Sequence, residues 1–191
     1  MSVRPLRYLG DPVLRTPSDP VTRFDDALAR LIADLLDTVQ EPGRAGLAAN
    51  QIGSSLAAFA YNVDGQLGYL INPRIVECEG EYDGPEGCLS IPGISADRRR
   101  CASATATGLN LQQEQVTVSG AGELARCLQH ETDHLRGELF IDRLDKAERR
   151  RIMRQIHARD LASAAGGIPG SHASPARESR RSARHLRCGQ P

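Results

Sequence analysis

The chain has 191 residues, and 24 lysines and arginines balance 24 aspartates and glutamates, so its formal net charge is zero. This length fits a single domain of about 100–200 residues, which can bury a core without disulfides. Proteins that coat nucleic acid are usually basic overall, and aromatic residues make up only 4% of this chain. The composition therefore gives no support to DNA binding.

The cysteines are five in number and irregularly spaced, at positions 78, 88, 101, 127 and 188. An odd, irregular set is not typical of a secreted disulfide framework. Residues 1–9 lack the apolar run of a signal peptide, and no stretch of the sequence approaches the ~18 apolar residues of a membrane span. We therefore expect a cytoplasmic protein without a membrane partner, in which the thiols stay free to bind metal.

Residues 5–20 are rich in proline and aspartate and are expected to form an extended arm. Apolar residues three and four positions apart then predict a helix over residues 22–40, which ends before Pro42 and Gly43. Strands are predicted over residues 57–63, 67–76, 102–111 and 116–119. Within the second of these, Asn72-Pro73 indicates an edge strand or a bend.

Two helices are predicted in the second half, over residues 122–136 and from residue 145 to about residue 165. Asp145 and Glu148 resemble a capping box at the start of the last helix, and Ile152 and Ile156 share one face of it. From residue 166 to 191 the composition shifts to Gly, Pro, Ser, Ala and Arg. Such a stretch cannot bury enough apolar surface to offset its ordering entropy, so we predict a disordered tail.

The sequence HETDH at residues 130–134 carries the strongest chemical signal. His130 and His134 are four positions apart, so on a helix both imidazoles could bind one metal ion. Glu131 projects close to the same face and could accept a proton from a metal-bound water. The alternative is a helix with two surface histidines. From the predicted helices and strands we expect an α+β fold, with mixed and mainly antiparallel strands around a central metal-binding helix and a helix near each end.

A catalytic metal site needs a third protein ligand and one open position. Cys88, in the sequence EGCLS, is the candidate, although a cysteine taken alone is more often a small buried apolar residue. Gln51 follows the small residues of GLAAN at 46–50, which permit close approach of the backbone to a substrate. Taken alone, Gln51 could equally be a surface glutamine after a tight turn.

Together, GLAANQ at 46–51, EGCLS at 86–90 and QHETDHL at 129–135 resemble the three signature segments of the peptide deformylases. They occur in the family's order and at similar separations. GDPVL at 10–14, Asn72-Pro73 and IDRL at 141–144 also resemble family segments. The resemblance covers about residues 5–160 and implies a peptide deformylase catalytic domain over residues 1–165, followed by the tail at 166–191.

The resemblance implies hydrolysis of the N-formyl group from the formyl-methionine of nascent polypeptides, which releases formate. A metal-bound hydroxide would attack, with Glu131 as general base and then acid, while Gln51 and the Leu89 backbone N–H stabilise the oxyanion. The implied metal ligands are Cys88, His130 and His134. The implied ion is Fe²⁺ in the cell, and Zn²⁺, Ni²⁺ or Co²⁺ could occupy the same site.

The methionine side chain needs an apolar pocket. We expect this pocket to be formed by Ala45, Gly46, Ile91, Arg126 and Cys127. Arg126 would contribute its aliphatic stem. Leu89, Ile91 and Cys127 could equally be ordinary core residues.

Two features depart from the family pattern. Arg44 stands where the family usually has a glycine, and could narrow the cleft or point to solvent. Residues 98–100 are all arginine where apolar residues are more typical. Arg99 or Arg100 could neutralise an acidic residue inside the motifs, and we expect Asp133 to take part in a structural ion pair.

The last predicted helix carries a run of arginines at positions 149, 150, 151, 154 and 159. A charge run is usually a solvated face, and the alternative implied by the family's substrate is contact with ribosomal RNA near the exit tunnel. Two rival functions stay open. A zinc peptidase would also carry HExxH, and a deformylase-like binding protein without catalysis would account for Arg44 and the arginines at 98–100.

Overall fold

The structure is a computed structural model that describes residues 2–166. Its helices are α1 (Asp26–Val39), α2 (Gly122–Leu135) and α3 (Lys146–Gly166), with short 3₁₀ turns at Pro12–Arg15, Ala49–Ile52 and Phe140–Arg143. Its strands are β1 (Gly46–Ala48), β2 (Ala58–Val63), β3 (Gln66–Glu79), β4 (Pro85–Cys88), β5 (Ile91–Asp97), β6 (Ser103–Leu109) and β7 (Gln115–Ala121).

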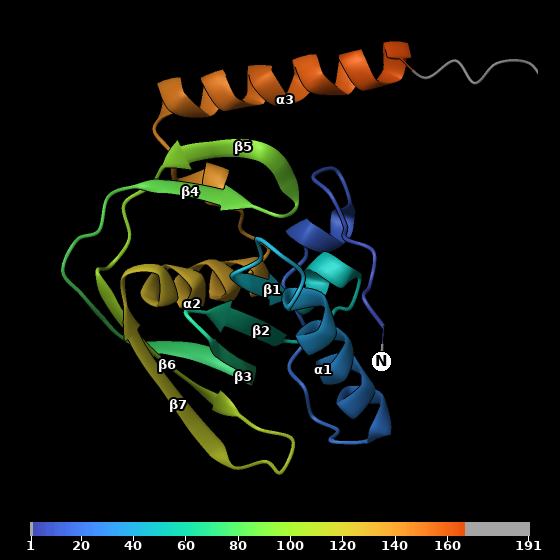
Figure 1. The fold of residues 1–191 in the computed structure, drawn as a ribbon, viewed down its shortest axis with the longest axis vertical. Helices are drawn as coiled ribbons and strands as arrows, with labels where there is room; N and C mark the ends of the chain where they lie inside the picture. The colour runs from blue at the N-terminus through green and yellow to red at the C-terminus, as the bar shows by residue number, and fades with distance from the viewer. Residues whose placement is uncertain (1, 167–191) are drawn as a thin grey trace, which may run out of the picture.

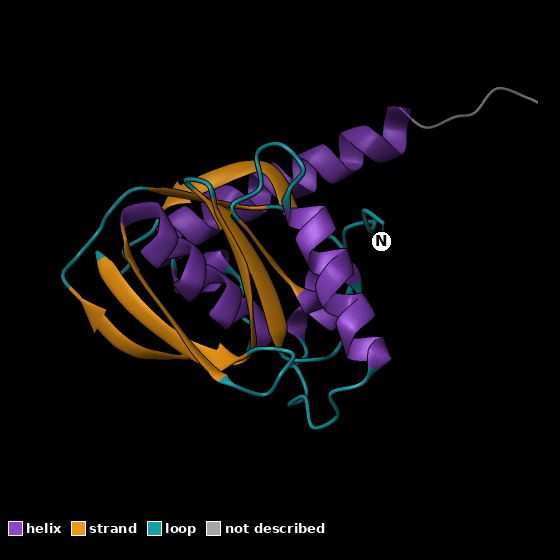
Figure 2. Cartoon of the chain, turned by 60° about the horizontal axis from the view of Figure 1, so that its bottom comes forward, coloured by secondary structure: helices purple, strands orange, loops and turns teal. Residues whose placement is uncertain are grey.

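The strands form two antiparallel sheets. A five-stranded sheet has the order β1-β2-β3-β6-β7, and β4 and β5 form a separate hairpin. Figure 1 shows α2 between the hairpin and the larger sheet, with α1 beside the sheet and α3 beyond the hairpin. The same arrangement is visible from below in Figure 2. The predicted α+β fold around a central helix, with a helix near each end, is confirmed.

The first helix begins four residues later than predicted because Asp25 caps it. The Asp25 carboxylate accepts hydrogen bonds from the backbone N–H groups of Ala27 and Leu28. Such a cap satisfies backbone donors that have no partner within the helix. The apolar stripe of α1, including Leu28 and Leu35, is buried against the sheet.

Strand β3 bends at Asn72-Pro73, as one of the two sequence alternatives predicts. Asn72 has a positive φ of 51°, and the pairing register with β6 shifts between Ile71 and Arg74. The Asn72 side chain is bonded to both the N–H and the carbonyl of Val21. Because β3 lies between β2 and β6, the edge-strand alternative is wrong. Proline is tolerated in an inner strand where a bulge interrupts the ladder.

The hairpin of β4 and β5 was not predicted. Along β4, Glu86 and Cys88 are buried while Pro85 and Gly87 are exposed. The alternation of a half-buried strand is therefore present, but its inward positions hold a carboxylate and a thiol in place of apolar residues. A search for alternating hydrophobicity cannot detect such a strand.

The last helix starts as predicted and carries its apolar face inward. Asp145 accepts hydrogen bonds from the N–H groups of Ala147 and Glu148. Ile152 and Ile156 are buried in a cluster with residues of β5 and the Phe140–Arg143 turn. The predicted tail at 166–191 lies outside the described residues, apart from Gly166 at the end of α3. Within residues 2–166, no helix is long and apolar enough to cross a membrane.

The expectation that the thiols stay free is wrong for two of the cysteines. Cys78 in β3 and Cys101, just before β6, form a disulfide, with their Cα atoms 5.5 Å apart. The antiparallel pairing of β3 with β6 brings the two residues together, and no local spacing in the sequence reveals that pairing. Cys88 and Cys127 are free and buried, and Cys188 lies outside the described residues.

The packing of α2 on the sheet predicts a large stability loss for Leu128→Ala. Leu128 is fully buried among apolar residues of the sheet, so truncation removes apolar contacts and leaves a cavity. We expect the free energy of unfolding, measured by urea denaturation, to fall by about 2–5 kcal/mol. Leu67→Ala is the matched control, because Leu67 is 45% exposed. It should change stability by less than about 0.5 kcal/mol. Equal effects would contradict this account of the core.

Candidate metal centre and active site

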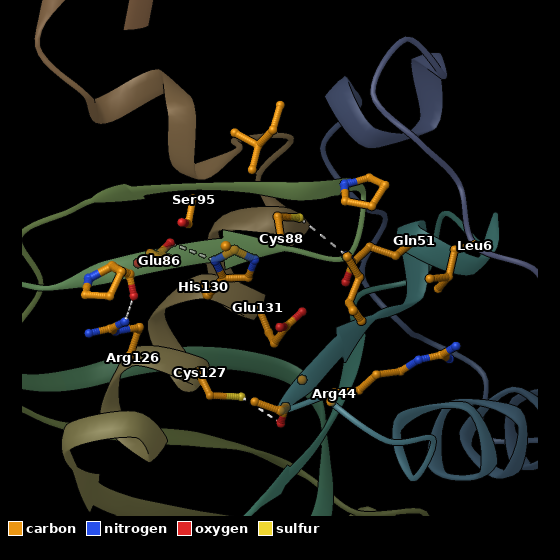
Figure 3. A pocket seen from close by; sticks show the side chains of 18 of the residues that line it. Leu6, Arg44, Gln51, Glu86, Cys88, Ser95, Arg126, Cys127, His130 and Glu131 are labelled. Atoms are coloured by element: carbon orange, nitrogen blue, oxygen red, sulfur yellow. Dashed lines mark hydrogen bonds and ion pairs between the residues drawn. The ribbon is translucent and has the colours of Figure 1, made fainter. Parts of the chain in front are cut away.

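Cys88, His130 and His134 form a buried group of potential metal ligands. Their ligand atoms all lie within 4.8 Å of one another. Cys88 Sγ is 3.2 Å from His134 Nε2, and the two imidazole centroids are 4.9 Å apart. The three residues that sequence analysis predicted as ligands are thus brought together from two elements that are distant in the chain. Figure 3 shows Cys88 above His130 at the edge of the cavity.

Local structure explains why the side chains meet. The helical repeat of α2 sets the histidines one turn apart on one face. Cys88 ends β4, and the following turn directs the Ser90 N–H to Cys88 Sγ at 3.4 Å. Asn50 Nδ2 donates to the His134 carbonyl at 2.6 Å, which ties the loop after β1 to the end of α2.

The orientation of His130 depends on Glu86. Glu86 Oε1 lies 2.7 Å from His130 Nδ1, which leaves Nε2 free to face the thiol. Ligand histidines usually have such an outer partner, which fixes the tautomer and the ring plane. A thiol and two imidazoles fit a divalent ion such as Zn²⁺ or Fe²⁺, and three protein ligands leave one position for a substrate or water. The donor set therefore fits a single catalytic metal ion.

Two arginines neutralise the acidic residues behind the histidines. Arg100 Nε and Nη2 donate to the two Glu86 oxygens at 2.8 Å, and Arg100 Nη1 donates to Asp133 at 2.7 Å. Arg98 Nη2 donates to Asp133 at 2.9 Å, and its Nη1 lies 3.5 Å from Glu86. The predicted roles of Arg100 and of an ion pair at Asp133 are confirmed. Burial alone would raise the pKa of Glu86, but its bonds to Arg100 and His130 hold that pKa far below the usual range.

Arg99 does not contribute to this network, and Arg98 was missed as a member. Arg99 points outward to an exposed pair with Glu81, at 3.5 Å. Alternate side chains of an extended segment point to opposite sides, so Arg98 and Arg100 share the inward side. The two-residue alternation of an extended segment is therefore the signal in the sequence that identifies Arg98 and Arg100 as the inward-pointing pair.

Glu131 lies beside the ligands in a fully buried position. Its pKa is raised to about 7, chiefly because burial disfavours the carboxylate. Its Oε2 has no hydrogen-bond partner among the described residues. A Cβ atom at Gly46 would lie 2.4 Å from Glu131 Oε1, so the glycine leaves room for this carboxylate. One carboxylate oxygen therefore has no partner among the described residues at the wall of the cavity.

Gln51 is buried, and its side-chain amide points toward Cys88. Its Oε1 accepts a hydrogen bond from the Ala48 N–H at 2.9 Å. Its Nε2 donates to Ser90 Oγ at 3.2 Å and lies 3.8 Å from Cys88 Sγ. With an exposed fraction of 1%, Gln51 is not the surface glutamine that the sequence alone left open.

A cavity of about 610 Å³ opens beside these groups (Figure 3). The predicted substrate residues Ala45, Gly46, Arg126 and Cys127 line it, and so does Leu89, the predicted oxyanion donor. Ile91 does not line the cavity: it is fully buried in the cluster beneath α3, so the prediction of a substrate contact is wrong for this residue. Ile94, from the same strand, lines the cavity instead.

The arm at the N-terminus adds residues that sequence analysis did not identify. Leu6 and Tyr8 line the cavity, and the N–H groups of Arg7 and Leu9 donate to the carbonyls of Gln51 and Ser90. The arm thus joins the two loops on either side of the thiol. Extended segments without apolar periodicity give no signal for such a contact.

Two other arginines at the cavity make contacts that fix their side chains. Arg44 Nη1 donates to the Thr38 carbonyl near the C-terminus of α1, and its guanidinium points away from Cys88 in Figure 3. A cation at this helix end is favourable. Arg126 donates to the Pro85 carbonyl and lies over the Tyr82 ring, 4.4 Å from its centroid. Its aliphatic stem therefore remains available as a cavity wall.

The buried network predicts opposite results for two neighbouring arginines. Arg100→Met leaves Glu86 and Asp133 with a single arginine, so the free energy of unfolding should fall by about 3–5 kcal/mol. Arg99→Met removes a pair that is about 70% exposed on both sides, and should cost less than about 1 kcal/mol. Chemical denaturation of both variants tests this difference. A small effect of Arg100→Met would show that the network contributes little to stability.

Comparisons with known proteins agree on one family. The family model described as polypeptide deformylase matches residues 3–150. The peptide deformylase of Acidothermus cellulolyticus is 53% identical, over 85% of this chain and 90% of that protein. Peptide deformylase 2 of Streptomyces coelicolor is 46% identical, over 81% and 89%. The crystal structure of a peptide deformylase from Legionella pneumophila superimposes with a TM-score of 0.79 at 37% identity, over 85% and 98%. This chain belongs to the peptide deformylase family.

Proposed function

We propose that this chain removes the formyl group from the N-terminal formyl-methionine of nascent polypeptides and releases formate. The observation that carries the proposal is the convergence of Cys88, His130 and His134 at a cavity whose wall includes Glu131 and Gln51. The similarity to proteins named peptide deformylase, over most of their length, supports the same reaction. Because nascent formylated chains are made in the cytoplasm, we propose that location as well.

Cys88, His130 and His134 are the proposed ligands of one divalent ion. We propose Fe²⁺ as the resident ion in the cell, by resemblance to the family, with Zn²⁺, Ni²⁺ or Co²⁺ able to occupy the same ligands. One thiolate and two imidazoles suit zinc equally well, so the ligands alone do not select iron. A bound ion would supply Lewis acidity toward the formyl oxygen and lower the pKa of a water molecule.

Glu131 is the proposed general base and acid. Its carboxylate takes a proton from the attacking water and delivers it to the nitrogen that leaves when the formyl C–N bond breaks. A pKa of about 7 suits a group that must accept and release a proton near neutral pH. The unpartnered Oε2 leaves one oxygen available for that transfer.

Gln51 and Leu89 are the proposed oxyanion donors. Gln51 Nε2 is held at the thiol by the bond between Gln51 Oε1 and the Ala48 N–H, so its direction is preset. Leu89 follows the thiol in a tight turn, where its backbone N–H could donate to the developing oxyanion. Loss of one oxyanion donor typically lowers turnover by about 10²–10³.

The proposed methionine pocket comprises Ala45, Gly46, Arg126 and Cys127. Apolar surface is offered by Cys127 and by the aliphatic stem of Arg126. The Cys127 thiol donates to the Ala45 carbonyl at 3.2 Å. The Arg126 guanidinium contacts the Pro85 carbonyl and the Tyr82 ring, so the methylene groups of the side chain keep a fixed position.

We also propose that α3 contacts ribosomal RNA near the exit tunnel. Arg149, Arg150, Arg151 and Arg154 are exposed along this helix. Arg149 and Arg151 form ion pairs with Asp142 and Glu148, while no ion pair within the described residues involves Arg150 or Arg154. The latter two are therefore the arginines best able to reach a phosphate backbone.

The general-base role predicts that Glu131→Gln keeps its metal but loses turnover. The amide preserves the shape of the side chain and cannot accept the proton, so kcat for formyl-Met-Ala-Ser should fall by about 10²–10⁴. Elemental analysis should find metal in Glu131→Gln and none in Cys88→Ala. Near-normal turnover of Glu131→Gln would contradict the assignment. Cleavage of unblocked Met-Ala-Ser by the parent chain would instead favour a zinc peptidase.

The RNA contact predicts that Arg150→Ala/Arg154→Ala weakens ribosome binding. Phosphate contacts release counterions, so co-sedimentation with ribosomes should fall with rising salt and be weaker for this variant at each salt concentration. Arg23→Ala/Arg30→Ala is the matched control, because it removes the same charge from an exposed region near α1. Equal binding of the two variants would support a merely solvated face. Activity on the free tripeptide should not change in either variant.

A further inference from the structure

The disulfide between Cys78 and Cys101 encloses the segment that carries the metal-binding thiol. The two cysteines are 23 positions apart, and residues 79–100 between them include β4, β5 and Cys88. We propose that this disulfide is a reversible redox-modification site that controls how tightly the protein holds its metal ion. The inference rests on the proposed metal ligands and goes beyond them, because neither cysteine belongs to the ligand group.

The hairpin is connected to the larger sheet through the segments at its two ends. Strands β4 and β5 pair with each other and with no strand of the five-stranded sheet. Figure 1 shows the two connections, from β3 to β4 and from β5 to β6, running along the same side of the molecule. Tyr82 and Arg100 join these connections through two backbone hydrogen bonds of 2.8 and 2.9 Å. The disulfide joins the same two connections with a covalent bond, and we call this end of the hairpin its base.

Gln129 links the disulfide to the metal helix. Gln129 Oε1 accepts from the Cys101 N–H at 3.0 Å and lies 3.6 Å from Cys78 Sγ. Gln129 Nε2 donates to the Cys101 carbonyl at 3.2 Å. Gln129 precedes His130 in the chain, and Cys101 follows Arg100, which binds Glu86 behind the same histidine. A movement of Cys101 would therefore affect His130 in two ways, through Gln129 and through Arg100 with Glu86.

Reduction would change this network chemically as well as mechanically. A disulfide sulfur has no proton to donate, whereas a Cys78 thiol could donate to Gln129 Oε1, the atom that now accepts from the Cys101 N–H. Loss of the covalent closure would also let the base of the hairpin separate. Because the Cα separation of 5.5 Å is typical of disulfides, reoxidation needs no rearrangement of the backbone.

The disulfide is accessible to a redox partner, unlike the other described cysteines. Cys78 is exposed and Cys101 half-buried, while Cys88 and Cys127 are buried. A thiolate of a dithiol reductant attacks Cys78 Sγ, and the Cys101 thiolate leaves and takes a proton from water. The second thiol of the reductant then displaces Cys78, so that two electrons pass to the protein and the reductant becomes a disulfide. Peroxide reverses the change: the two thiols lose two hydrogens, and peroxide becomes two waters.

The experiment compares the two redox states of the full chain loaded with Zn²⁺, an ion that does not change its oxidation state. One sample is left oxidised, and the other is treated with a water-soluble phosphine, which with water converts the disulfide to two thiols and becomes a phosphine oxide. Alkylation and mass spectrometry report the state of Cys78 and Cys101. Competition with a chromogenic zinc chelator measures zinc affinity, and a thermal scan measures Tm.

The reduced protein should bind zinc about tenfold more weakly, the lower end of the effect of losing an outer partner of a ligand. Its Tm should fall by about 6–12 °C, as expected when a loop of this length is opened in a protein of this size. Oxidised glutathione should restore both values. Cys78→Ser/Cys101→Ser should match the reduced protein and should not respond to phosphine, which separates the effect from any reaction at Cys88.

Equal zinc affinity in the two verified redox states would overturn the proposal, as would thiols at 78 and 101 that stay free after treatment with oxidant. These outcomes use the unmodified chain, so they decide the question even if the double variant does not fold. Failure of both states to bind zinc would overturn the metal-ligand assignment along with this proposal. Deformylase activity is not the readout, so the two inferences fail in distinguishable ways.

Discussion

Glu86 accepts hydrogen bonds from Arg100 and His130 at once, in a position where only 2% of the residue is exposed. A carboxylate at this depth is tolerated because its charge is compensated within hydrogen-bond distance. Arg98 and Asp133 complete the set, so two positive charges compensate two negative ones, with three of the four side chains buried and Asp133 partly buried. The plane of the His130 ring depends on this cluster through the contact between Glu86 Oε1 and His130 Nδ1.

The same cluster explains the arginines that looked out of place in the sequence. Arg98 and Arg100 occupy inward positions after β5, where apolar residues would leave Glu86 and Asp133 without compensation. Together with Arg44, which is bound at the end of α1, they no longer favour a binding protein that has lost catalysis. Arg98 and Arg100 are accounted for because they compensate Glu86 and Asp133, and Glu86 in turn orients His130.

Features that depend on local spacing were accessible from the sequence. His130 and His134 share a helical face because any two helical residues four positions apart do so. The Asp145 cap likewise involves only the residues that directly follow it. Features that depend on the register of distant strands were not. The Cys78–Cys101 pair follows from the pairing of β3 with β6, and Leu6 reaches the cavity because its arm crosses the loops that hold Gln51. Periodicity carries no information on either contact.

Strand β4 shows why the secondary structure around Cys88 could not be predicted, although Cys88 itself was identified. A strand is recognised by apolar residues on its buried face, and here that face presents Glu86 and Cys88. A strand with so little apolar surface contributes little to its own docking, so its position must be set by the elements around it. β5 supplies Ile91 to the cluster beneath α3, and Cys78–Cys101 closes the base. Within residues 78–101, Glu86 and Cys88 therefore provide the polar groups of the site, whereas Ile91 and the Cys78–Cys101 disulfide hold the hairpin in place.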